Sequence, residues 1–273
     1  LLTSEGRLDS QAARRPSNVL ITTRRLPPGH RYHAHAVGHQ ALAVVVNEAN
    51  PLTGISQHDL RRIFEQSVRD WREIDGIDDN SLGPIQLFLP PPGWQTAMFG
   101  DLVLDGTRPE QAARSFTVAI NVKAMAEAIS TGRIGAIGFL PLETLAQLHP
   151  DARARLRVLA IRGRDSQAQE PTPSAIRSGR YPLSRLLYAY TDGPVAAGSA
   201  TARLLEFWQS RLGQDVVERF DRFGYVGLHE PARFTPQRQA LPDGRTQWML
   251  PRAEQQRLAD ELERYIAADR IRP

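Results

Sequence analysis

Short apolar runs alternate with amphipathic segments along the whole chain. Six runs rich in aliphatic and β-branched residues lie at 19–23, 41–46, 84–89, 134–139, 156–161 and 186–190. Runs of this length, bounded by Gly, Pro and Asn, predict buried strands. The run 41–46 is apolar at every position, which predicts a strand covered on both faces, as in a parallel or mixed sheet.

Apolar residues at helical spacing predict helices between these strands, at 56–66, 96–104, 121–131, 199–220 and 254–268. Ser56 followed by Asp59 resembles a capping box, and Asn121 is a good N-cap. Gly132 stands where a left-handed C-terminal cap is expected. The polar segment 162–179 predicts a surface loop. Strands that alternate with helices predict an α/β fold.

Composition narrows the classes of protein. The chain has 273 residues, 41% of them hydrophobic, and a formal net charge of +4, which excludes a disordered chain. No apolar run approaches the roughly 20 residues of a membrane helix. A single core tends to split beyond about 250–300 residues, so two lobes are expected. There is no cysteine, which excludes disulfides and thiolate chemistry and fits an oxidising compartment.

Positive charge is spread along the chain. Lys123 is the only lysine among 34 basic residues, so the other 33 are arginine, and acidic residues are interspersed with them. No block of five like charges occurs, which argues against a nucleic-acid surface. The chain begins Leu1-Leu2-Thr3-Ser4, without an initiator Met or the pattern of a signal peptide. We therefore expect a chain that is processed, excised or truncated.

Signals for catalysis or metal binding are weak. Nucleophile-elbow, zinc-protease and phosphate-loop motifs are all absent, so an enzyme is not expected. The region 30–39 holds four histidines. The Pro and Gly residues just before it predict a connection between regular elements. His33 and His35 would share a strand face as a metal pair, but no acidic residue completes the site. The acidic turn 75–79 resembles half a calcium loop without its liganding Glu. We predict no cofactor and no metal.

Four stretches carry a family resemblance. Residues 42–71 read LAVVVNEANPLTGISQHDLRRIFEQSVRDW, followed by the element 125–139, then Tyr181-Pro182-Leu183-Ser184-Arg185, and last the stretch 207–226 ending in Gly224-Tyr225-Val226. In this order they resemble the phosphate-binding type II periplasmic solute-binding proteins. The resemblance covers residues 16–228 and implies two α/β lobes around a cleft, joined by two crossing strands. It also implies a bound oxyanion, held by helix N-termini and hydroxyl donors.

The sequence departs from the family pattern at the expected anion site. The family's first strand and Gly-Ser-Thr loop are absent, so the first lobe is expected to be incomplete. Gly93, Trp94 and Gln95 stand where Ser, Gly and Thr are expected, and Asn18 replaces a frequent Asp. Each missing donor to a buried anion costs about 1.5–3 kcal/mol. High-affinity capture by this chain alone is not expected, unless an upstream portion supplies the missing element.

The sequence therefore predicts an extracytoplasmic solute-binding-like protein for phosphate or a related oxyanion, delivering to an ABC transporter. Thr22, Thr23 and Arg24 match the family's Ser-Ser-Arg and are candidate contacts, joined by Gln95 and Thr96. An alternative is an interaction or regulatory module with a decayed anion site. The expected organisation is a first lobe in 1–47, a second in 48–180, a hinge and return in 181–228, and an extension with an amphipathic helix in 229–273.

Overall fold

The computed structural model describes residues 19–22, 31–74, 77, 82–163, 167–210, 213–214, 226–228, 237–240 and 246–249. The chain divides into two compact units, Leu1–His229 and Glu230–Pro273. The predicted helix at 254–268 lies outside the described residues. Of the second unit, the structure describes a two-stranded antiparallel pair, β10 (Gln237–Ala240) and β11 (Thr246–Met249).

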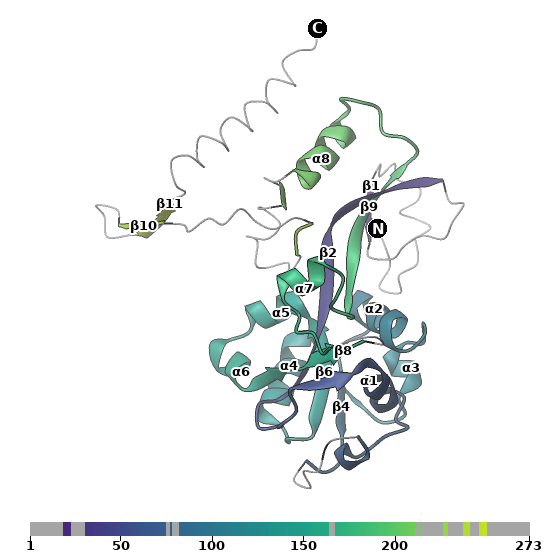
Figure 1. The fold of residues 1–273 in the computed structure, drawn as a ribbon, viewed down its shortest axis with the longest axis vertical. Coiled ribbons are helices and arrows are strands. Elements are labelled where there is room, and N and C mark those ends of the chain that lie inside the picture. The colour runs from purple at the N-terminus through teal and green to yellow at the C-terminus, as the bar shows by residue number, and fades with distance from the viewer. Residues whose placement is uncertain are drawn as a thin grey trace. The chain divides into compact units, whose positions relative to one another are not determined.

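A mixed seven-stranded sheet forms the centre of the first unit (Figure 1). Its strands are β1 (Val19–Thr22), β2 (Tyr32–Asn47), β4 (Gln86–Leu89), β5 (Thr117–Val118), β6 (Ala136–Pro141), β7 (Leu156–Val158) and β9 (Ser184–Asp192). The strand order is β1-β9-β2-β6-β4-β5, and β7 pairs with β2. A separate parallel pair joins β3 (Gly54–Ser56) to β8 (Ala160–Arg162). The predicted strand at 156–161 is thus two strands in different sheets.

The long strand β2 pairs with different strands along its two halves. Its first part, from Tyr32 to Ala41, pairs antiparallel with β9, and its second part pairs with β6 and β7. Figure 1 shows β2 and β9 running side by side. The expectation of an irregular connection around the histidines was wrong for the described part, because the ladder to β9 holds these polar residues in extended backbone.

Alternation along β2 explains the fully apolar run at 41–46. Leu42, Val44 and Val46 lie in one buried cluster, while Ala43 and Val45 lie in another. Successive side chains of a strand point to opposite faces, so both faces of this segment are covered. The prediction of a strand buried on both sides of a mixed sheet is confirmed.

Helices flank the sheet. They are α1 (Gln57–Phe64), α2 (Trp94–Val103), α3 (Pro109–Ala112), α4 (Val122–Thr131), α5 (Leu142–Gln147), α6 (Pro150–Ala154), α7 (Pro173–Arg177) and α8 (Ala200–Gln209). Residues of α1 and α2 belong to the first cluster, and residues of α4 and α5 to the second. None of the described helices is long and apolar enough to cross a membrane.

Several local predictions can be checked. Ser56 caps α1, accepting from the Asp59 N–H at 2.9 Å, and Asn121 caps α4, accepting from the Ala124 N–H at 2.8 Å. The left-handed cap at Gly132 was wrong, because its φ is −83°. The surface loop at 162–179 contains α7, which Thr172 caps and whose Ile176 is buried. Of the helix expected at 199–220, the structure describes α8, which ends at Gln209, and two further helical residues, Gly213 and Gln214, while 211–212 and 215–220 lie outside the described residues.

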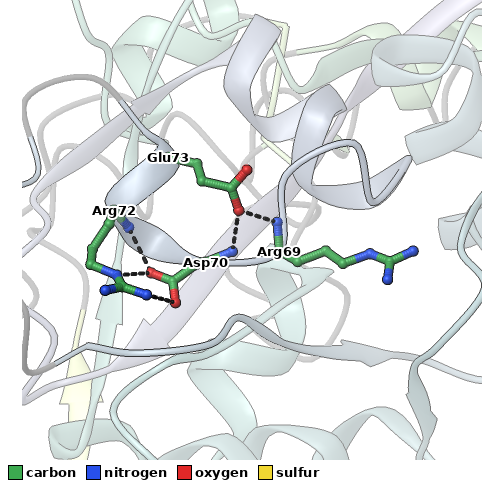
Figure 2. A network of polar contacts seen from close by, with 4 residues as sticks. All are labelled: Arg69, Asp70, Arg72 and Glu73. Atoms are coloured by element: carbon green, nitrogen blue, oxygen red, sulfur yellow. Dashed lines mark hydrogen bonds and ion pairs between the residues drawn. The ribbon is translucent and has the colours of Figure 1, made fainter.

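A short 3-10 helix, η2 (Trp71–Glu73), follows α1 and begins with a reciprocal capping box (Figure 2). The Asp70 carboxylate accepts from the Arg72 N–H at 3.0 Å and from its guanidinium at 2.8 and 2.9 Å. The Glu73 carboxylate accepts from the N–H groups of Asp70 and Arg69. This frame holds Trp71, fully buried, with its indole N–H donating to the Gly135 carbonyl at 3.1 Å.

Candidate functional site

Three helices start at one edge of the sheet. β4 runs parallel to both β5 and β6, so the carboxyl ends of these strands lie at the same edge. After β4 the chain enters α2, after β5 it enters α4, and after β6 it enters α5. Ligands of α/β proteins bind beyond the carboxyl ends of parallel strands, where helix N-termini gather. This edge is therefore the candidate site.

The first turn of α2 carries two residues predicted to contact an anion. The Thr96 hydroxyl accepts from the Gly93 N–H at 3.0 Å and donates to the Gly93 carbonyl at 2.9 Å. The Gln95 side-chain amide donates to the Pro91 carbonyl at 2.8 Å. Both side chains are buried, Thr96 completely, and both organise the loop before the helix.

Backbone donors remain at the start of α2. The Ala97 N–H donates to the Gly93 carbonyl at 3.1 Å. For the N–H groups of Trp94, Gln95 and Thr96, no acceptor exists among the described residues. Consecutive N–H groups at a helix start, together with the helix dipole, favour an anion. The arrangement can hold an oxyanion by its backbone rather than by these two side chains.

The Trp94 side chain is 38% exposed. Trp94 stands where the family resemblance expects a Gly, which would let the backbone approach an anion closely. In the structure the indole is partly in solvent, at the first position of α2.

Helix α2 is held firmly at two points. Phe99 stacks on Phe139 of β6 with ring centroids 4.0 Å apart, and Phe64 of α1 lies 4.5 Å from Phe99. Asp101 accepts from the Arg185 guanidinium at 2.8 Å, which ties α2 to the first residues of β9. These contacts fix the direction of the helix start relative to the sheet.

Thr22, another predicted contact, lies on strand β1 and not on α2. It ends β1 opposite Tyr188 of β9 and is 7% exposed. Because β1 runs antiparallel to β9, its carboxyl end points along β9 toward Arg185. Thr23 and Arg24 lie outside the described residues. The structure thus brings Gln95 and Thr96 together on α2, and places Thr22 on β1.

The segment Tyr181 to Arg185 leads into β9 and is hydrogen-bonded to the middle of β2. Tyr181 is 1% exposed, and its hydroxyl donates to the Leu42 carbonyl at 2.8 Å. The Leu42 N–H donates to the Leu183 carbonyl at 2.9 Å. Burial raises the pKa of Tyr181, so its hydroxyl keeps its proton at any physiological pH. These bonds lock the start of β9 to the middle of β2.

The sequence reading missed a buried carboxyl group at the same sheet edge. Glu143 lies in the first turn of α5, and its Oε2 is buried without a hydrogen-bond partner among the described residues. Burial raises the pKa of Glu143 from 4.5 to about 7. The signal that could have found it is its position, two residues after the apolar strand β6.

The predicted histidine and acidic clusters supply no metal site in the described part of the chain. No group of three or more His, Cys, Asp or Glu side chains there could hold an ion. His35 Nε2 lies 3.2 Å from the Thr191 hydroxyl, and burial lowers the pKa of His35. Asp75, Asp78 and Asp79 lie outside the described residues.

A mixed sheet crossed by a long antiparallel strand, with helix starts at the carboxyl edge of its parallel strands, defines a type II periplasmic-binding-protein fold. The comparisons with known proteins agree. The family model described as "PBP superfamily domain" matches residues 7–210, and the chain belongs to this family. The predicted resemblance and fold class are confirmed. The family match also confirms that the chain belongs with binding proteins and not with enzymes.

Two curated relatives are similar in sequence. Protein SphX of Synechococcus elongatus is 25% identical over 217 residues, which is 77% of this chain and 61% of the relative. Phosphate-binding protein PstS of Bacillus subtilis is 26% identical over 183 residues, 67% of this chain and 53% of the relative. The chain therefore spans between about half and three fifths of the length of these relatives.

Solved structures share the fold. An ABC-type phosphate transport receptor from Vibrio cholerae superposes with a TM-score of 0.60 at 19% identity. The superposition covers 77% of this chain and 79% of that one. The chain therefore resembles this protein in the arrangement of its strands and helices, which agrees with the family match in sequence.

Proposed function

We propose that this chain binds inorganic phosphate or a related oxyanion at the start of α2. The observation that carries the proposal is the set of three consecutive N–H groups, of Trp94, Gln95 and Thr96, without an acceptor in the described part of the chain. The name of the Bacillus subtilis relative points to phosphate as the anion. Gln95 and Thr96 act through their backbone, since their side chains organise the preceding loop.

Thr22, Thr23 and Arg24 would supply further donors. Thr22 ends a strand that points toward the first residues of β9, where Arg185 holds α2. Arg24, two residues after Thr22, would meet the need of a tetrahedral anion for a charged donor. The lobes would comprise 1–47 with 181–228 on one side and 48–180 on the other, with 229–273 as an extension.

The wider role we propose is delivery of the anion to the membrane subunits of an ABC transporter, outside the cytoplasm. The Vibrio cholerae protein that shares this fold is named as a receptor of such a system. The absence of cysteine from the chain fits an oxidising compartment. An interaction module with a decayed anion site is the second candidate, favoured by the exposed indole of Trp94 and by the separate unit Glu230–Pro273.

Calorimetric titration distinguishes the two candidates. The chain titrated with phosphate, and separately with sulfate, is expected to show saturable heat with a dissociation constant below about 1 mM for phosphate. A chain that gives no phosphate-dependent heat up to about 10 mM, while folded by circular dichroism, would contradict the binding proposal and favour the interaction module.

A further inference from the structure

Strand β9 is attached to both halves of the proposed phosphate site. At Tyr188 it pairs with Thr22, the last residue of β1 and one of the proposed contacts. At Arg185, three residues earlier, it is bonded to α2, whose first turn carries the proposed N–H donors. Residues of a strand are about 3.3 Å apart, so the two attachments lie about 10 Å from each other along β9. The spacing between the two halves of the site therefore depends on how firmly each is fixed to this strand.

The two attachments differ in kind. Strand β1 is fixed by backbone pairing, since each of its four residues, Val19 to Thr22, has a partner in β9. Helix α2 is linked to β9 by a pair of charged side chains, in which Arg185 Nη1 donates to Asp101 Oδ2 at 2.8 Å. The pair joins a residue of the expected hinge, 181–228, to a residue of the expected second lobe, 48–180. It is therefore a link between the parts of the chain that carry the two halves of the site.

The backbone around Arg185 is well anchored. Arg185 pairs with Gln40 of β2 near the end of the ladder between β2 and β9. Just before it, the buried Tyr181 hydroxyl donates to the Leu42 carbonyl at 2.8 Å. The side chains of Arg185 and Asp101 are 26% and 35% exposed, so water reaches both charges. An ion pair of this exposure adds little to the stability of a fold, but it can still fix the direction of a helix that it bonds.

We propose that Arg185 is a positioning residue of the phosphate site and acts through Asp101. The ion pair holds the start of α2 at a fixed distance from the end of β1, so that one anion accepts hydrogen bonds from both. This role rests on the proposed function of the α2 start. Donors already held in the bound arrangement bind more tightly than donors that binding must first order. Without the pair, α2 keeps its aromatic packing and its N–H groups but is free to shift relative to β1.

A second ion pair at the other end of α2 supplies a matched control. Arg61 of α1 donates to Asp105, which lies two residues after the end of α2. Both residues belong to the expected second lobe, so this pair does not reach β9. Asp105→Asn removes one carboxylate charge, as Asp101→Asn does, and leaves the link to Arg185 in place. A difference between these two variants therefore reports the link and not the change of net charge.

Calorimetric titration of the whole chain with inorganic phosphate tests the role. Arg185→Gln and Asp101→Asn are each expected to weaken binding about fivefold or more, and the double variant no further than the weaker single variant, because both changes break one link. Arg185→Lys, which keeps a charged donor for Asp101, and Asp105→Asn are expected to bind within about twofold of the natural chain. Thermal midpoints should stay within about 3 °C, whereas a purely structural role would lower them without a separate loss of affinity.

Distances between spin labels give a readout that needs no ligand. The chain has no cysteine, so two introduced cysteines can be labelled without background. Ile21→Cys on β1 and Thr107→Cys beyond the end of α2 are both at exposed positions. In the ligand-free protein, Arg185→Gln and Asp101→Asn are expected to broaden the distribution of distances between the two labels. Asp105→Asn is expected to leave the distribution unchanged.

The results separate the positioning role from the proposed function. A natural chain that binds no phosphate would overturn both. If the natural chain binds phosphate and the Arg185→Gln and Asp101→Asn variants bind it equally well, only the positioning role is wrong. The same conclusion follows if both variants leave the label distances unchanged, or if their losses of affinity add in the double variant, since two residues that act through one bond cannot lose it twice.

Discussion

Glu143 makes the stability of this protein depend on pH in an unusual direction. Burial raises the pKa of its carboxyl group from 4.5 to about 7 in the folded chain. Between these two values the folded state holds a proton that the unfolded state has released. The contribution of Glu143 to the free energy of unfolding therefore falls as pH rises through this interval and is constant above it.

The size of this effect follows from the shift. At about 1.36 kcal/mol per pKa unit, the difference between 4.5 and about 7 corresponds to at most about 3 kcal/mol. Because the side chain is only partly buried, solvent screening reduces the expected loss to about 1.5–3 kcal/mol. Glu143→Gln, which cannot ionise, should remove this loss.

Urea unfolding of the protein and of Glu143→Gln at intervals between pH 4 and 8.5 measures the effect. The two proteins should differ least near pH 4, and the variant should gain about 1.5–3 kcal/mol relative to the natural chain by pH 8. Glu48→Gln, at an exposed carboxylate, is the matched control and should follow the natural chain. A constant difference between Glu143→Gln and the natural chain across this range would refute the reasoning.

The remaining predictions concern a buried hydrogen bond at the start of β9, the aromatic packing of α2 and the N-cap of α1. Tyr181→Phe removes the donor to the buried Leu42 carbonyl and should cost about 1–2 kcal/mol in urea unfolding, whereas Tyr188→Phe should cost less than about 0.5 kcal/mol. Equal costs would contradict the role given to the Tyr181 hydroxyl. Phe99→Ala opens a cavity in the aromatic cluster and should cost about 3–5 kcal/mol, and a loss below about 1 kcal/mol would show that the cluster does not anchor α2. Ser56→Ala removes the α1 cap and should lower stability by about 1 kcal/mol in thermal unfolding, whereas an unchanged midpoint would argue against the cap.

Local patterns in the sequence predicted much of the fold. The run 41–46 indicated a strand covered on both faces, and Ser56 and Asn121 marked helix starts. These signals are contained in a few neighbouring residues. The histidine segment was misread because its extended conformation comes from pairing with β9, about 150 residues away in the sequence. Periodicity within the segment cannot show such a partner.

The candidate site was predicted less completely. Family resemblance indicated Gln95 and Thr96, and the structure places both on the first turn of α2. Their side chains, however, bond to Pro91 and Gly93, and these bonds depend on how the loop before α2 folds back on the helix start. Glu143 was missed because its burial depends on how α5 packs on the sheet.

The central claim, that the first turn of α2 binds phosphate through its backbone, is tested most directly at position 94. Trp94→Ala and Trp94→Pro both remove the indole, but only the second removes the N–H, and proline is tolerated at the first position of a helix. In calorimetric titration, Trp94→Pro should bind phosphate about 10-fold or more weakly than Trp94→Ala, as expected for the loss of one charge-assisted hydrogen bond. Equal phosphate affinities of two variants with equal thermal stability would contradict the claim.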